Sequence, residues 1–215
     1  MTIAVMTHRV ITGIVVAMPR WSLRAEDRLR DAALDLFLDH GYDNVTVAQI
    51  TERAGLTRRT FSRYFTDKRD VLFAGSERLP AALADAVLHA DDALTPFAAL
   101  MAALTDAGEL LASSVTRSAE RRAVIMASPE LQERERTKFA AVTDALTVAL
   151  QERGVPEPEA RLLARIGAAI FQTAFERWAE RPERSGLPAR IREAADELAG
   201  NLRTAAVPAV SGRGK

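Results

Sequence analysis

Helical spacing of the apolar residues is the feature that most limits the fold of this chain. From Leu23 onward they recur at intervals of three and four, and most prolines and glycines fall between the segments defined in this way. No run of alternating apolar and polar residues is long enough to indicate a strand. The pattern therefore predicts an all-α protein with a small N-terminal three-helix unit and a larger C-terminal helical bundle.

Turn and capping residues set the expected helix boundaries. Gly41 ends a first helix that begins near Leu23, and Pro96 and Pro129 suit the first turn of two later helices. The expected helices cover residues 23–40, 47–54, 58–64, 66–89, from 95 onward, 128–153, 157–180 and 188–204. The chain then divides into a tail at 1–22, an N-terminal domain at 23–69, a C-terminal domain at 70–205 and a disordered tail at 206–215.

The composition excludes several kinds of site. The 215 residues include no cysteine and only three histidines, which lie far apart in sequence. Disulfides, cysteine nucleophiles and thiolate zinc sites are therefore excluded, and a histidine metal site has little to build on. We expect no metal and no cofactor.

The apolar run Val10–Met18 is about half of the ~20 residues that a membrane span needs. It could be the core of a signal peptide, but Pro19-Arg20-Trp21 follows it in place of a small-residue cleavage site. We expect residues 1–22 to be a disordered tail or, up to residue 17, sequence that precedes a true start at Met18. The prediction is a cytoplasmic protein without a membrane partner.

Residues 23–65 have the proportions of a helix-turn-helix. Thr46 and Gln49 form a capping-box pattern at the start of the second helix, and Gly55 stands where the chain must turn sharply. Thr57 is a plausible cap for the third helix. In that helix three aromatic residues can pack inward, and the opposite face carries four polar or basic residues, which are Arg58, Arg59, Ser62 and Arg63.

A basic segment lies within a chain whose net charge is zero. Between residues 53 and 69 there are six basic side chains and one acid, a local charge of +5. A short helix with an anchored apolar side and an arginine-rich outer side suits a DNA major groove, because arginine bonds guanine bidentately or holds a phosphate. The alternative is that these arginines form an ordinary solvated helix face.

Residues 26–73 resemble the N-terminal domain of the TetR/AcrR family of transcriptional regulators. The resemblance lies in the segments Ala32–Tyr42, Val45–Thr57 and Thr60–Phe73, and Ser62 departs from it because the family often has tyrosine there. It implies that Thr46, Tyr64 and Lys68 contact phosphates and that Arg58, Arg59, Thr60 and Ser62 lie on or near base edges. Arg63 could do either, and Thr57 is a DNA-site candidate that could act only as a cap.

The C-terminal two thirds carry no catalytic motif, and their many carboxylates alternate with arginines in the manner of solvated helix pairs. We therefore predict no enzyme activity. The resemblance implies a small-molecule site inside this bundle and dimerisation through its last two long helices. The candidate ligand residues are Leu100, Met101, Leu104, Met126, Phe139, Phe171 and Phe175. The candidate dimer residues are Leu163, Gly167, Ile170, Ala174, Trp178, Ile191, Ala195, Leu198 and Leu202. Plain core packing is the alternative for both sets, and we expect Arg121 and Arg122 to be exposed although they could meet an anionic ligand.

The predicted function is a homodimeric transcriptional regulator, most simply a repressor. It would bind a pseudo-palindromic duplex operator through two recognition helices and leave it when a small-molecule effector binds. The alternatives are a transcriptional activator, a non-catalytic interaction protein whose basic patch meets an acidic partner, and an all-α enzyme with an appended helix-turn-helix. The sequence identifies neither the effector nor the operator.

Overall fold

The computed structural model describes residues 20–73, 76–114, 117–180 and 186–205, and no β-strand occurs among them. The tails predicted at 1–22 and 206–215 lie outside these residues, except that α2 already begins at Arg20. The elements are α2 (Arg20–His40), α3 (Val47–Arg53), α4 (Arg58–Tyr64), α5 (Asp70–Phe73), the 3₁₀ turn η1 (Ser76–Arg78), α6 (Leu79–Leu88), α7 (Pro96–Ser114), α8 (Ser118–Met126), α9 (Pro129–Glu152), α10 (Glu157–Glu180) and α11 (Gly186–Ala205).

Local sequence signals explain the longest helices. Ser128 caps α9 by accepting a hydrogen bond from the amide of Leu131 at 3.5 Å, and Pro129 occupies the first turn. The helix ends before Gly154, whose φ of +86° favours glycine. The bounds predicted for this helix and for α10 agree with the structure to within one residue.

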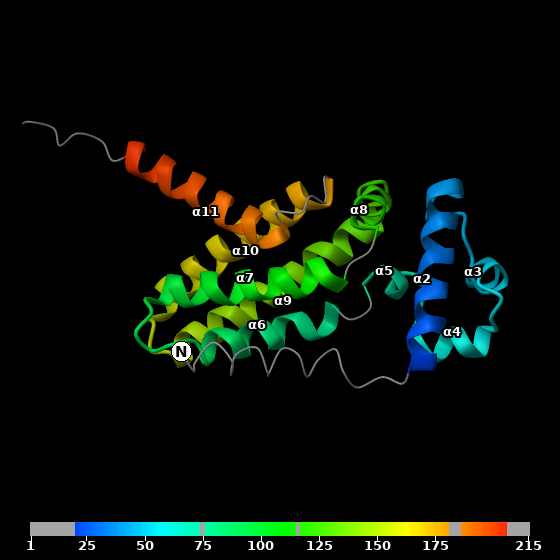
Figure 1. Ribbon diagram of the computed structural model, residues 1–215, viewed down its shortest axis with the longest axis horizontal. Helices are drawn as coiled ribbons and strands as arrows, with labels where there is room; N and C mark the ends of the chain where they lie inside the picture. Colours follow the sequence, from blue (N-terminus) through cyan, green and yellow to red (C-terminus); the bar gives the residue numbers. More distant parts are fainter. Residues whose placement is uncertain (1–19, 74–75, 115–116, 181–185, 206–215) are drawn as a thin grey trace, which may run out of the picture.

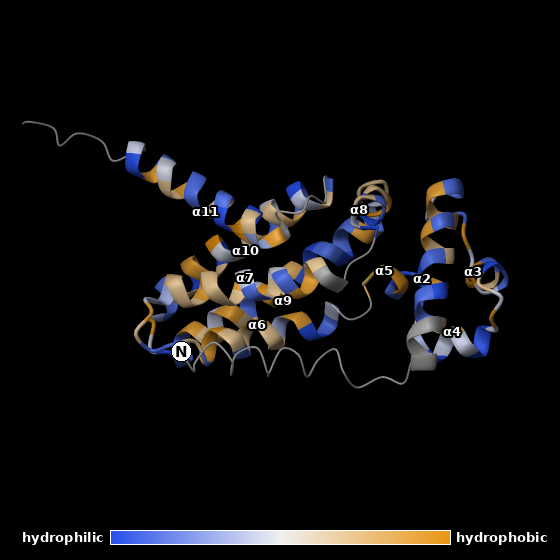
Figure 2. Ribbon diagram, in the orientation of Figure 1, coloured by the Kyte–Doolittle hydropathy of each residue, from blue (hydrophilic) through white to orange (hydrophobic). Residues whose placement is uncertain are grey.

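The helices form two packed groups (Figure 1). At one end α2, α3 and α4 pack together, and at the other α6, α7, α9, α10 and α11 form a bundle. Apolar residues line the inner faces of this bundle (Figure 2). Leu100, Leu146 and Ile191, from three different helices, are completely buried in its core.

A second core joins the N-terminal helices to part of the C-terminal chain. Leu29, Ile50 and Phe61 pack there with the α5 residues 71–73, and α8 and the first turn of α9 contribute buried side chains. The latter are Val124, Ile125 and Leu131. Two short segments of the C-terminal chain are therefore built into the core of the N-terminal helices.

The single helix predicted over residues 66–89 is wrong. The chain forms α5, η1 and α6 there, with residues 74–75 outside the described part. Asp67 Oδ1 accepts hydrogen bonds from the amides of Arg69 and Asp70, a side-chain turn that delays the helix until residue 70. Pro80 lies in the first turn of α6, which begins as a separate helix.

Helix α8 was not predicted as a separate element, and its start has an unusual backbone. Arg117 precedes it with a φ of 55°, in the left-handed region. Its guanidinium is held by Asp35 of α2 at 2.8 Å and by Glu120. No described helix is both long and apolar enough to cross a membrane.

Candidate DNA-binding interface

Helix α4 is anchored by two aromatic side chains. Phe61 and Phe65 are each 2% exposed, and their ring centroids lie 5.3 Å apart at an interplanar angle of 54°. Their burial against α2 and α3 directs the other face of the helix to solvent. That face carries Arg58, Arg59 and, a turn later, the other exposed residues, Ser62 and Arg63.

The turn that places α4 is fixed by backbone geometry. Gly55 has a φ of +62°, and its amide and that of Leu56 donate to Glu52 O at 2.9 Å and Thr51 O at 2.8 Å. Thr57 then caps α4 by accepting from the amide of Thr60 at 3.1 Å. The helix-turn-helix geometry expected from the sequence is present.

The capping box predicted at the start of α3 is confirmed. Thr46 Oγ1 accepts from the amide of Gln49 at 3.4 Å, and the Gln49 side chain accepts from the Thr46 amide at 2.8 Å. Thr46 is exposed beside the first turn of α3. The free amides of that turn and the threonine hydroxyl therefore face solvent at one edge of the helix pair.

The basic charge of this segment is more localised than the sequence count of +5 indicates. Arg53 pairs with Asp35 of α2 at 3.4 Å, and Arg69 pairs with Asp67 and with Glu130 of α9 at 3.2 Å. The cations that no described acid neutralises within 4 Å are then Lys68, which contacts backbone carbonyls, and the three exposed ones of α4, namely Arg58, Arg59 and Arg63. Positive charge is concentrated on the exposed face of α4.

Two of the predicted phosphate contacts have partners within the chain. Lys68 Nζ donates to the carbonyls of Tyr42 at 2.8 Å, Val45 at 3.1 Å and Asp43 at 3.4 Å, and it lies 4.1 Å from the centroid of the Tyr42 ring. A phosphate contact by Lys68 would have to replace one of these bonds. Tyr64 is half-buried, and its hydroxyl accepts a hydrogen bond from Arg63.

The candidate ligand residues lie mostly together in the core of the C-terminal bundle. Leu100, Leu104 and Phe171 are at most 3% exposed, and Met101, Phe139 and Phe175 pack against them. Met126 is different, because it lies at the end of α8 and is 53% exposed.

The stripe predicted for dimer contact faces mainly into the protomer. Gly167, Ile170, Ala174, Trp178 and Ile191 are buried in the bundle core. A Cβ added at Gly167 would lie 2.6 Å from Leu100 Cδ2, so this glycine makes room for a side chain of the same protomer. Leu163, Ala195 and Leu198 are partly buried and Leu202 is 62% exposed, so these four remain available to a partner.

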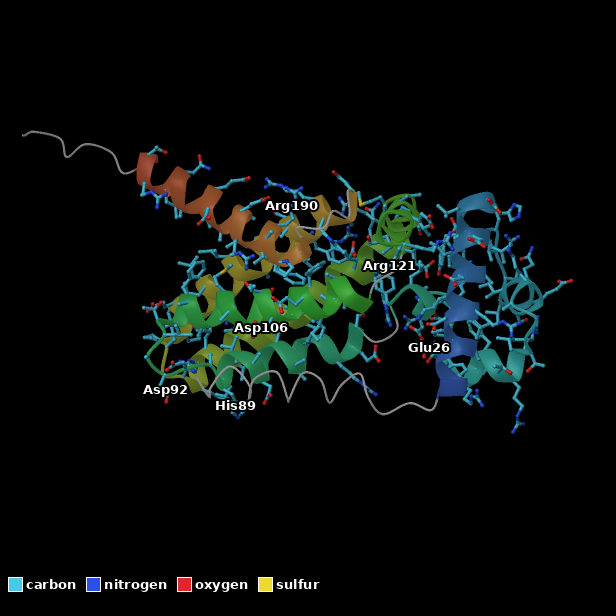
Figure 3. The ribbon with its side chains drawn as sticks, in the orientation of Figure 1. Glu26, His89, Asp92, Asp106, Arg121 and Arg190 are labelled. Atoms are coloured by element: carbon cyan, nitrogen blue, oxygen red, sulfur yellow. The ribbon has the colours of Figure 1, made fainter. Side chains whose placement is uncertain are left out.

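The expectation that Arg121 and Arg122 are exposed is wrong. Arg121 is largely covered at the junction of α8 with the α5 segment (Figure 3), and its Nε donates to the carbonyl of Leu72 at 2.6 Å. Arg122 is also partly covered, and it pairs with Glu176 of α10 at 3.4 Å. The partial burial of these two arginines was not predicted, because residues 118–126 were not assigned to a separate helix that packs against both α2 and α10.

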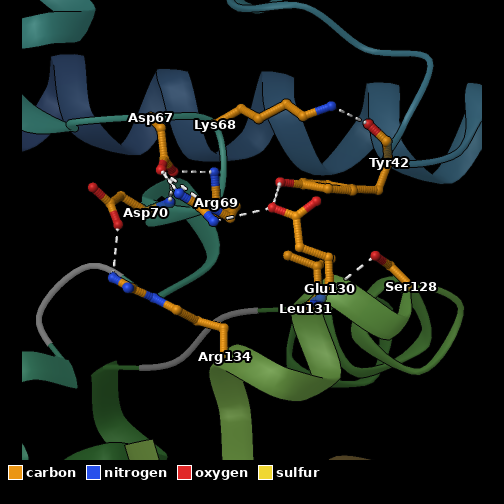
Figure 4. A network of polar contacts seen from close by, with 9 residues as sticks. All are labelled: Tyr42, Asp67, Lys68, Arg69, Asp70, Ser128, Glu130, Leu131 and Arg134. Atoms are coloured by element: carbon orange, nitrogen blue, oxygen red, sulfur yellow. Dashed lines mark hydrogen bonds and ion pairs between the residues drawn. The ribbon is translucent and has the colours of Figure 1, made fainter. Parts of the chain in front are cut away.

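A polar network between the helix-turn-helix and α9 was also not predicted (Figure 4). Glu130 accepts from the Tyr42 hydroxyl at 3.5 Å and pairs with Arg69, and Arg134 pairs with Asp70 at 3.0 Å. Burial, followed by the charge of Glu130, raises the pKa of Tyr42, which keeps its hydroxyl a donor. The Ser128-Pro129-Glu130 pattern predicted the start of α9, but it did not predict the contacts of Glu130 with Tyr42 and Arg69.

The fold and this interface define a helix-turn-helix DNA-binding protein with a separate helical domain. Residues 29–74 match the family described as bacterial regulatory proteins, tetR family, and residues 94–203 match the MftR C-terminal domain, which covers just over half of the chain. The chain belongs to the TetR family of transcriptional regulators, which are DNA-binding proteins and not enzymes.

Individual relatives agree with this assignment. The chain is 28% identical over 155 residues to a mycofactocin biosynthesis transcriptional regulator, MftR, of Mycobacterium tuberculosis, covering 70% of this chain and 77% of the relative. It is 38% identical over 74 residues to the regulator BetI of Klebsiella pneumoniae, covering 34% and 38%. The triclosan complex of SmeT, a repressor from Stenotrophomonas maltophilia, shares the fold with a TM-score of 0.57, 23% identity and coverage of 82% and 90%.

Proposed function

We propose that the protein is a homodimeric repressor that binds a pseudo-palindromic operator in the bacterial cytoplasm and is released by a small-molecule effector. The observation that carries the DNA-binding part is the exposed arginine face of α4, held outward by buried Phe61 and Phe65. Arg58, Arg59, Thr60 and Ser62 would read base edges in the major groove, and Thr46 and Tyr64 would hold phosphates. Lys68 would act mainly through the loop before α3 that it holds.

The test compares Arg59→Ala with Arg136→Ala, a control at an exposed arginine of α9. On a duplex enriched from a random pool, Arg59→Ala should weaken binding by ~1–3 kcal/mol and relax preference at one base position. Arg136→Ala should bind like the parent. Equal affinity of the parent and Arg59→Ala would contradict a base contact, and equal loss on all sequences would make Arg59 a phosphate contact.

Dimerisation is proposed through the outer faces of α10 and α11. Leu162 is 57% exposed on α10 and Leu202 is 62% exposed on α11, although α10 and α11 pack together. These two leucines, with the partly buried Leu198, are the apolar side chains that a second copy would cover. Leu162→Glu should shift the mass measured by light scattering from dimer to monomer, whereas Val148→Glu, at a similarly exposed position of α9, should not.

Effector release requires that the ligand bind one arrangement of the two α4 helices better than the other, since it cannot shift the equilibrium by more than this difference. The route from the C-terminal bundle to α4 would run through α8 and the start of α9, because their side chains complete the N-terminal core. The bundle residues Leu100, Met101, Leu104, Phe139, Phe171 and Phe175 remain the proposed apolar walls of the ligand site.

A further inference from the structure

A cavity of about 140 Å³ lies where the N-terminal helices meet the turn between α8 and α9. Phe37 and Tyr42 line it from α2 and the turn that follows, and Val124 lines it from α8. These three side chains are at most 5% exposed, and the centroids of the two rings lie 5.2 Å apart. An apolar cavity of roughly this size can hold one benzene molecule.

The cavity also has a buried hydroxyl group whose proton is not used. Ser128, at the start of α9 (Figure 4), lines the cavity and is 3% exposed. Its Oγ accepts a long hydrogen bond, at 3.5 Å, from the amide of Leu131, and it donates none to any described residue. A buried hydroxyl donor without an acceptor is unfavourable. The cavity therefore favours a molecule that brings an acceptor atom to Ser128.

The residues that line the cavity disfavour a charged ligand. They include the exposed Asp43 and Asn44, and no described residue among them is basic; Lys68, which holds the carbonyls of Tyr42 and Asp43, does not line the cavity. An anion would lose water there without gaining a cation. An ammonium group has no acceptor for the Ser128 hydroxyl, whereas a neutral hydroxyl group both accepts and donates.

We propose that this cavity binds a neutral molecule with one aromatic ring and a hydroxyl group, of the size of phenol. The ring would lie against Phe37, Tyr42 and Val124, and the hydroxyl oxygen would accept a hydrogen bond from Ser128. The site is separate from the proposed ligand site in the C-terminal bundle, because none of the buried residues of the bundle core lines the cavity. It goes beyond the proposed function and does not rest on it.

A molecule in this cavity would contact both groups of helices. Its walls come from α2 and the turn before α3 on the N-terminal side, and from the end of α8 and the cap of α9 on the other. Bound phenol therefore stabilises the present arrangement of the two groups. Amide hydrogen exchange in residues 41–45 and 124–131 should become slower when phenol is added.

Titrations of the ¹⁵N-labelled full chain at pH 7, followed by amide chemical shifts, test the site with four probes. Phenol should bind with a dissociation constant of about 1 mM or less and shift the amides of residues 41–44 and 124–128. Toluene, benzoate and benzylammonium, which lack the neutral hydroxyl, should bind about threefold or more weakly. No binding of phenol, shifts confined to the core of the C-terminal bundle, or equal binding of any of the other three probes would overturn the proposal.

A cavity-filling variant locates the bound molecule. Ala127 lines the cavity from an exposed position at the end of α8, so Ala127→Leu should weaken phenol binding by about tenfold or more. Ala119→Leu, at an exposed alanine of α8 that does not line the cavity, should bind phenol like the parent. Unchanged affinity of Ala127→Leu, or an equal loss in both variants, would overturn the location.

A second variant tests the hydrogen bond. Ser128→Ala should weaken phenol binding by about three- to tenfold and leave toluene binding unchanged. Ser128 also caps α9, but a loosened helix start would weaken both probes alike, so an equal loss for phenol and toluene would contradict the role of the hydroxyl. Operator binding is measured separately: a chain that binds phenol but no DNA would contradict the proposed function alone, and a chain that binds DNA but not phenol would contradict this site alone.

Discussion

At the scale of single residues, the partners of each cation decide what the basic segment can offer to DNA. Lys68 and Arg69 are close in sequence to the arginines of α4, but the first holds three carbonyls and the second holds two carboxylates. Formal charge counted along a chain does not distinguish such residues from Arg58 and Arg59. The basic surface that is available to DNA is therefore smaller than the charge count along the sequence indicates, and it is centred on the exposed face of α4.

Gly55 is predicted to be required by the turn before α4. Alanine there must adopt a φ of +62°, and its Cβ would lie 2.9 Å from a terminal nitrogen of Arg28. Gly55→Ala should lower the free energy of unfolding by ~1–2 kcal/mol, measured by urea denaturation. Gly200→Ala is the matched control, since a Cβ there meets nothing within 4 Å in a helix and should stabilise by about 0.5–1 kcal/mol. Equal effects of the two substitutions would contradict this explanation.

Asp67 is predicted to make stability depend on pH. The hydrogen bond from Arg69 holds the pKa of Asp67 below its usual value, so its ionised form contributes stability near neutral pH. The contribution is lost as the pH falls through the lowered pKa. Asp67→Asn keeps the capping oxygen and should cost under about 1 kcal/mol at pH 7, because both side chains are more than a third exposed. The difference from the parent should shrink toward pH 2, and a difference that grows on acidification would contradict the ion pair.

At the scale of elements, the sequence was sufficient to predict those helices whose capping and turn residues lie next to the helix itself. The cap of Thr57, the turn at Gly55 and the two buried aromatics defined α4 from sequence alone. The interruption of the helix predicted over residues 66–89 was not foreseen. It depends on a side-chain turn at Asp67 and on burial of α5 in a core whose other residues are distant in sequence. Helical periodicity also could not separate a dimer face from a protomer core, as at Gly167, because both require the same apolar stripe.

The first turns of α9 are predicted to hold the segment that joins α4 to α5. The double variant Glu130→Gln/Arg134→Met removes the carboxylate charge that pairs with Arg69 across the junction and the cation that pairs with Asp70. Amide hydrogen exchange in residues 66–73 should become faster, by a factor of about five or less, since these pairs are partly exposed.

The control for this experiment lies on the same helix. Glu133→Gln/Arg136→Met removes an exposed pair, 2.6 Å long, that contacts only its own helix. Exchange in residues 66–73 should then equal that of the parent. Equal acceleration in both double variants would mean that α9 as a whole, and not its contacts with α4–α5, was disturbed.

At the scale of the whole molecule, the two groups of helices are not independent. Helix α8 and the first turn of α9 supply Val124, Ile125 and Leu131 to the N-terminal core, while the rest of α9 lies in the C-terminal bundle. A rearrangement of the bundle that moves α9 must therefore be accommodated among the helices that carry α4 (Figure 1). This shared packing gives a physical basis for coupling between a ligand in the bundle and DNA at α4.

The central claim is that the arginine face of α4 enters the major groove of a two-fold symmetric duplex site. The most direct test is selection of bound fragments from a random pool of duplex DNA by the purified full-length chain without added ligand. The account predicts enrichment of an inverted repeat whose half-sites are centred about one helical turn, ~34–36 Å, or a multiple of it apart. A bound pool with the same sequence distribution as the input would contradict it.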